Sequence, residues 1–349
     1  MGMHVAGFFQ DFAAESDTVG MPSWMLTSLT AALSLPANPS IHALAAAKAT
    51  GSLSLWDSVR PRSRQVAAWE LKLFFPQRSD GDMQRQLGLR SQADQDKTLR
   101  AVSAVSVAGI CGATLIEGSA LPVSIRTGLT SVAALAPFAT LIAGVALPDV
   151  LQRALMAVWR LDPKYRRRQA YHEAGHLLIG MLLGLQIVSY NAASPDGNGA
   201  AVRLSPPDAR SWDASRGLVS DSDEAAAGAA CEDALLDALL VLSMGGVAAE
   251  VLACGDAEGG VSDVAQARCF LERKWSTGVQ SAPTRRTARA KQDDRIRWAT
   301  LFALTLLQRH RASLDAVVEA FDEGADVGAC LCAAQNAAAL DDMRLSGAS

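Results

Sequence analysis

His172-Glu173-Ala174-Gly175-His176 lies within a predicted helix that follows a helix-start signal at Asp162-Pro163 and runs through residues 170–185. Residues four apart on a helix share one side, so both histidines can direct an imidazole nitrogen at one metal ion. Zinc lowers the pKa of bound water to about 7, and Glu173 is placed to take its proton as general base. We therefore predict one Zn²⁺ per chain, bound by His172 and His176, with Glu173 as the catalytic residue.

A catalytic zinc usually has three protein ligands, so one more must come from elsewhere in the chain. Asp263 opens a predicted helix after the glycine-rich turn Gly259-Gly260-Val261-Ser262. Glu250 ends the segment Gly245-Gly246-Val247-Ala248-Ala249-Glu250 on another predicted helix. Asp263 could instead cap its helix, and Glu250 could face solvent or support a ligand side chain. Residue types alone leave both open as the third ligand.

Residues 101–148 are strongly apolar. The run 101–116 carries no charge, and the charge-free run 127–148 exceeds the roughly 20 residues that a membrane helix needs. Basic residues flank the region on both sides: Arg85, Arg90, Lys97 and Arg100 before it, and Arg153, Arg160, Lys164, Arg166, Arg167 and Arg168 after it. This pattern predicts a transmembrane helical hairpin with both ends on the positive-inside face. The alternative is a pair of buried Ala/Val helices in a soluble core.

Composition limits the remaining possibilities. The chain has 349 residues, of which 50% are hydrophobic and 19% charged, below the roughly 25% of an average soluble domain. Its net charge of −4 gives no reason to expect a nucleic-acid partner. Six cysteines without a CxxC pair argue against a disulfide framework. We expect a mainly α fold with a small β-hairpin formed by residues 186–190 and 201–204.

Several segments match one known family in order. The run Ala170-Tyr171-His172-Glu173-Ala174-Gly175-His176 resembles the zinc motif of the FtsH-type membrane-bound metalloproteases. The predicted strand–turn–strand follows, and then Met244-Gly245-Gly246-Val247-Ala248-Ala249-Glu250 resembles the family's Gly-Gly-Arg-Ala-Ala-Glu helix. Gly259-Gly260-Val261-Ser262-Asp263 resembles its Thr-Gly-Ala-Ser-Asn-Asp segment, whose final Asp is the third zinc ligand. The resemblance covers residues 160–325 and favours Asp263 over Glu250.

The chain also departs from that family. It contains no Gly-x-x-x-x-Gly-Lys-Ser/Thr phosphate loop, so the resemblance implies the peptidase domain without the AAA ATPase module. Val247 replaces the family's Arg, and Ser262 replaces its Asn. We expect four parts: a helical region of unassigned role at 1–100, the hairpin at 101–148, a zinc metallopeptidase domain at 155–325, and a C-terminal tail at 326–349.

The resemblance implies a membrane-tethered zinc metalloendopeptidase that needs no ATP and cleaves unfolded or extended polypeptides. Its other expected partners are membrane lipid and either complete FtsH-type AAA proteases or further copies of this chain. The alternatives are a non-proteolytic accessory or scaffold subunit of such complexes and a soluble zinc-binding regulator. An organellar membrane is expected, with the chloroplast thylakoid or envelope favoured over the mitochondrion, and the peptidase domain on the positive-inside face.

Overall fold

Helix α9 (Pro163–Leu182) carries the two motif histidines and contacts helices from most of the chain that follows it. Asp162 caps its start by accepting a hydrogen bond from the Lys164 amide at 2.9 Å, and Pro163 occupies the first turn, as the sequence predicts. The computed structural model describes residues 34–67, 69–70, 91–146, 161–191, 201–205, 224–257, 259–277 and 285–347. These residues are mainly helical, which confirms the prediction of a mainly α fold.

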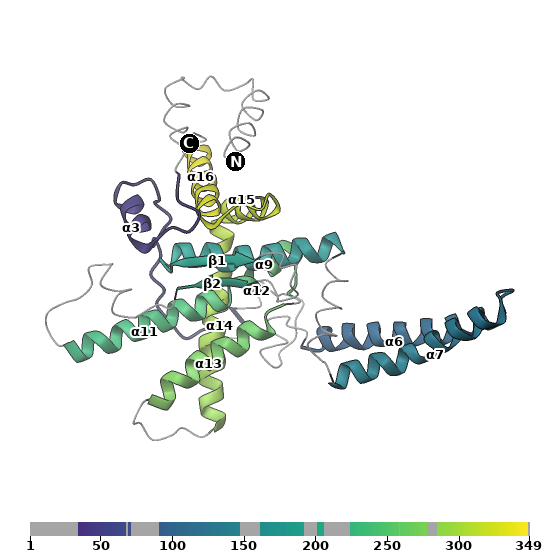
Figure 1. The fold of residues 1–349 in the computed structure, drawn as a ribbon. Coiled ribbons are helices and arrows are strands. Elements are labelled where there is room, and N and C mark those ends of the chain that lie inside the picture. Colours follow the sequence, from purple (N-terminus) through teal and green to yellow (C-terminus); the bar gives the residue numbers. More distant parts are fainter. Residues whose placement is uncertain are drawn as a thin grey trace, which may run out of the picture. The chain divides into compact units, whose positions relative to one another are not determined.

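Four helices follow the β-strands, namely α11 (Glu224–Ser243), α12 (Gly245–Cys254), α13 (Val261–Thr277) and α14 (Arg285–Arg309), and of these α11, α12 and α14 contact α9. Helix α12 lies against α9 where two glycines meet (Figure 1). A Cβ on Gly175 would overlap the Gly245 carbonyl and, at 2.6 Å, the Cβ of Ala249. The glycines therefore bring the two backbones close enough for α12 to reach the histidine motif.

The predicted β-hairpin is present. Strands β1 (Ile187–Asn191) and β2 (Ala201–Leu204) pair antiparallel, with Tyr190 opposite Val202 and a register shift between Ile187 and Ser189. Both strands contact α9. The sheet is thus held beside the helix that carries the motif.

Residues 35–67, which include α3 (Ile41–Ala49), pack onto the helices that come after the apolar hairpin. The amides of Asp57 and Val59 donate to the Met181 and Leu182 carbonyls at 3.0 Å each, and so satisfy the C-terminal end of α9. The Ser63 amide donates to Asp237 on α11 at 3.0 Å. Residues 35–67, part of the predicted 1–100 region, therefore pack with α9 and the helices around it. In the sequence, the apolar hairpin lies between residues 35–67 and α9.

The last two helices are α15 (Arg311–Asp322) and α16 (Val327–Gly347), which pack on each other. Residues 326–349, predicted as a tail, include the helix α16, whose buried side chains include Leu331 and Gln335. Gln335 accepts a hydrogen bond from the Leu55 amide at 2.9 Å, which ties α16 to the N-terminal segment.

The 101–148 region contains two helices that lie side by side, α6 (Ser91–Glu117) and α7 (Val123–Ala146) (Figure 1). Pro137 lies inside α7 and has no N–H for the Ala133 carbonyl one turn earlier. Gly109 of α6 faces this carbonyl, and a Cβ there would lie 2.8 Å from its oxygen. Residues 147–148, the end of the predicted hairpin, and 155–160, the start of the predicted peptidase domain, lie outside the described residues.

Hydropathy alone points to a different helix as a membrane span. Among the described residues, one helical stretch, Cys231–Cys254, is long and apolar enough to cross a bilayer, and 83% of its most apolar window is buried. In the predicted hairpin, Ser103–Glu117 is a shorter apolar helix. Cys231–Cys254 covers parts of α11 and α12, whose apolar side chains pack inside the protein. The structure supports two paired helices at the hairpin without placing them in a membrane.

Candidate metal centre

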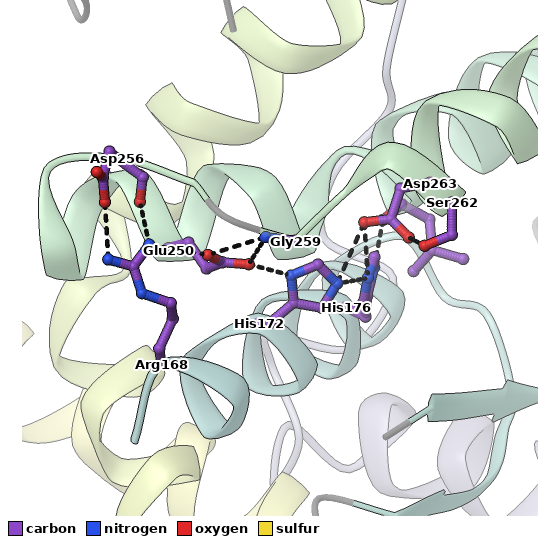
Figure 2. Close-up of polar contacts among 9 residues, drawn as sticks. Arg168, His172, His176, Glu250, Asp256, Gly259, Ser262 and Asp263 are labelled. Atoms are coloured by element: carbon purple, nitrogen blue, oxygen red, sulfur yellow. Dashed lines mark hydrogen bonds and ion pairs between the residues drawn. The ribbon is translucent and has the colours of Figure 1, made fainter. Parts of the chain in front are cut away.

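His172 and His176 lie one turn apart on α9, and each imidazole is held through its Nδ1 atom (Figure 2). His176 Nδ1 lies 2.8 Å from the Leu242 carbonyl, and His172 Nδ1 lies 2.7 Å from Glu250 Oε1. A carbonyl only accepts hydrogen bonds, and so does an ionised carboxylate, so both Nδ1 atoms carry a proton. In each neutral ring the lone pair is therefore on Nε2, the nitrogen that remains free to bind a metal.

The two Nε2 atoms converge with a carboxylate oxygen of Asp263. They lie 3.2 Å from each other, and Asp263 Oδ2 lies 3.2 Å from His172 Nε2 and 3.6 Å from that of His176. Asp263 Oδ2 is buried and makes no hydrogen bond of good geometry. Two imidazole nitrogens and one carboxylate oxygen within 4.8 Å of one another could hold a metal ion, with the donor types that zinc takes.

The pKa shifts of His172 and Asp263 both favour the charged form of the side chain. Burial lowers the pKa of His172, but the nearby carboxylates of Asp263 and Glu250 outweigh burial and raise it well above its usual value. Burial raises the pKa of Asp263, but the two histidines hold it far below its usual range. The site therefore favours positive charge at the imidazoles, which a bound cation supplies without placing two protonated rings in contact.

The structure distinguishes the two carboxylates that the sequence left open. Asp263 lies in the first turn of α13, after a turn in which Gly260 has a positive φ of 94°, and it faces the Nε2 atoms. Glu250 instead faces His172 Nδ1 and accepts the Gly259 amide at 3.2 Å. Thus Asp263 joins the two histidines in a group that could hold a metal ion, and Glu250 contacts the other nitrogen of the His172 ring.

Glu173 is 3% exposed, and its Oε2 atom is buried without a hydrogen-bond partner. Burial raises its pKa, although the neighbouring His172 and His176 oppose the shift. The Val202 backbone also lowers the pKa of Glu173, which places strand β2 close to this carboxyl. This buried carboxyl beside the cluster is suited to gaining and losing a proton nearer neutral pH than an exposed one.

Two residues join this cluster without having been expected there. The sequence indicates Arg168 only as part of a basic group after the hairpin and gives no role to Asp256. Arg168 contacts both Glu250 and Asp256 (Figure 2). Spacing held a clue: Arg168 precedes His172 by four residues and so lies on the same side of the helix.

Comparisons of the chain with protein-family models, with curated proteins and with solved structures found no match.

Proposed function

We propose that this protein is a zinc-dependent metalloendopeptidase of the FtsH peptidase type, tethered to a membrane and acting without ATP. The observation that carries the proposal is the orientation of the histidines: both Nδ1 atoms are engaged, and both Nε2 atoms face Asp263. The buried Glu173 beside them supports a hydrolytic role, since binding a metal for structure alone needs no such carboxyl.

His172, His176 and Asp263 would hold the metal. Zinc bound there supplies Lewis-acid chemistry, which polarises a substrate carbonyl and makes water a nucleophile near neutral pH. Glu173 takes a proton from the attacking water at its carboxylate and delivers it to the leaving amine. Its raised pKa favours the first half of this transfer, because the protonated form is less costly there than at an exposed carboxyl.

Strand β2 supports a polypeptide substrate. It pairs with β1, and the backbone of Val202 on β2 lies close enough to Glu173 to lower the pKa of that carboxyl. An extended peptide that added to the other edge of β2 would bring its own backbone carbonyls near Glu173. This mode of binding requires an unfolded or extended segment, consistent with a chain in which no ATPase motif is found.

The membrane tether is proposed for α6 and α7. Large apolar side chains on these helices and their connection are 41–75% exposed, among them Val107, Ile110, Leu115, Val132, Leu135, Phe138 and Ile142. The 24 residues of α7 extend about 36 Å, enough for the hydrocarbon core of a bilayer. Lipid would cover these side chains. Hydrocarbon cannot solvate the Ala133 carbonyl that Pro137 leaves without a donor, and Gly109 would cover it.

The function is tested with the full chain in detergent, by measuring bound zinc and the cleavage of an unstructured protein without ATP. Glu173→Gln should keep zinc and lose cleavage by about 10²–10⁴-fold. His176→Asn should lose both, and Glu272→Gln, at an exposed position on α13, should lose neither. Zinc without cleavage in the wild type would contradict the enzyme and favour an accessory subunit. A folded chain without zinc would contradict the metal site itself.

A further inference from the structure

Arg168 turns inward from a run of basic residues. Lys164, Arg166 and Arg167 are exposed on the first turns of α9, whereas the Arg168 side chain is 19% exposed. The residues Arg168, His172 and His176 follow each other at intervals of four and therefore lie along one side of the helix. The guanidinium thus lies one turn before the first proposed zinc ligand, on the same face.

The guanidinium makes contacts with two segments at once. Its Nη1 lies 3.3 Å from Glu250 Oε2 on α12 and 3.2 Å from the Asp256 carbonyl. Its Nη2 lies 2.7 Å from Asp256 Oδ1, in the loop that leads to α13. Glu250 uses its other oxygen on His172 Nδ1 and also accepts the Gly259 amide of that loop (Figure 2).

We propose that Arg168 is a positioning residue that sets the affinity and geometry of the metal site, a role that rests on the proposed function. Through Glu250 it orients the His172 ring, and through Asp256 it holds the loop that presents Asp263. One side chain therefore couples two ligands that come from different helices. Glu250 is 2% exposed, and Arg168 supplies a cation to this buried carboxylate.

The planar fork of arginine matters here, because one guanidinium serves a carboxylate, a carbonyl and a second carboxylate. Lysine would supply the charge from a single point and could not reach all three groups together. Loss of the charge would free Glu250 to take a different position. That change would weaken its hydrogen bond to His172 and loosen the loop before Asp263.

The test is zinc affinity, measured on the full chain in detergent by competition with a chromophoric chelator. Arg168→Gln should lower the affinity by about 10–100-fold, the usual effect of losing a group that supports a metal ligand. The zinc affinity of Arg168→Lys should lie between those of Arg168→Gln and the wild type. The matched control is Arg166→Gln, two residues away and exposed on the same helix, which should bind zinc as the wild type does.

Two further measurements separate positioning from a general loss of structure. Asp256→Asn should also weaken zinc binding, and the double variant Arg168→Gln/Asp256→Asn should bind zinc no more weakly than the worse single variant, since the Asp256 side chain acts through its contact with Arg168. Cobalt bound in place of zinc should show altered visible absorption bands in Arg168→Gln, while the metal-free proteins keep the same circular dichroism.

Wild-type affinity and an unchanged cobalt spectrum in Arg168→Gln would overturn the inference and leave the proposed function standing. Equal losses in Arg168→Gln and Arg166→Gln would also overturn it, since they would show a general effect of charge. A wild-type chain that binds no zinc at all would instead sink the proposed function, and this inference with it.

Discussion

The α9–α12 pair and the α6–α7 pair use the same steric device in different surroundings. In each, a glycine faces a backbone carbonyl of the partner helix: Gly175 faces Gly245, and Gly109 faces Ala133. The α9 pair is enclosed by other helices, and residues 177–179 on it are fully buried. The α6 pair leaves Leu115, Phe138 and other large apolar side chains exposed.

This difference shows what close helix contact serves in each place. Around α9, the protein supplies the apolar surroundings, and the close approach brings Glu250 to His172. Along α6 and α7, the outward side chains are apolar and the contact closes over a carbonyl left without its N–H partner. The α9–α12 contact thus forms a polar site inside the protein. The α6–α7 contact is suited to surroundings that are themselves apolar.

The largest expected effect comes from Gly175→Ala. A Cβ there overlaps backbone that cannot rotate away, so we expect a loss of about 2–3 kcal/mol in the free energy of unfolding by denaturant. The control is Gly180→Ala on the same helix, where the nearest atom to the new Cβ is 3.4 Å away. That change should be neutral or stabilising by up to about 1 kcal/mol through helix propensity. Similar unfolding curves for the two variants would show that the close α9–α12 contact is not needed.

A smaller and more local effect is expected from Gly246→Ala. A Cβ at this position of α12 would overlap the His172 imidazole ring, a side chain that can turn aside. The ring would then leave Glu250, and zinc affinity should fall by about 10–100-fold while the unfolding free energy changes little. Chelator competition and denaturant titration on the same samples check both halves. A variant that keeps wild-type zinc affinity would place His172 outside the metal site.

Contacts between residues that are close in the sequence could be predicted, and contacts between residues far apart could not. The spacing of His172 and His176 and the cap at Asp162 follow from helix geometry and hold in the structure. The contact of Arg168 with Glu250 joins residues 82 apart, so no local pattern contains it. The same reason hid the packing of residues 35–67 on α9 and α16. Composition also cannot separate Cys231–Cys254, which is buried by protein, from a helix that is buried by lipid.

Gly109→Ala should disturb the hairpin alone. Its new Cβ meets the Ala133 carbonyl at 2.8 Å and the Pro137 ring at 3.2 Å, so α6 and α7 must separate. Hydrogen exchange measured by mass spectrometry should rise in both helices, while zinc content and the unfolding of the α9 helices stay unchanged. Gly112→Ala, one turn later in α6, has no atom within 4 Å of its new Cβ and is the matched control. Faster exchange in both variants would contradict a specific contact at Gly109.

The smallest effects, in the native cysteines, compare the two regions without any substitution. Cys269 on α13 is exposed and should react with a water-soluble maleimide at pH 7.5 both in membrane vesicles and after the lipid is dissolved in denaturing detergent. Cys330 is buried, and burial raises its pKa to about 12, so it should react only after denaturation.

Cys111 lies in the charge-free part of α6 and is exposed in the protein itself. In vesicles it should behave like Cys330, because hydrocarbon excludes the water-soluble reagent. Peptide mass spectrometry distinguishes the three sites. If Cys111 reacts in vesicles as readily as Cys269, water reaches α6, and the apolar face of the hairpin must be covered by something other than lipid.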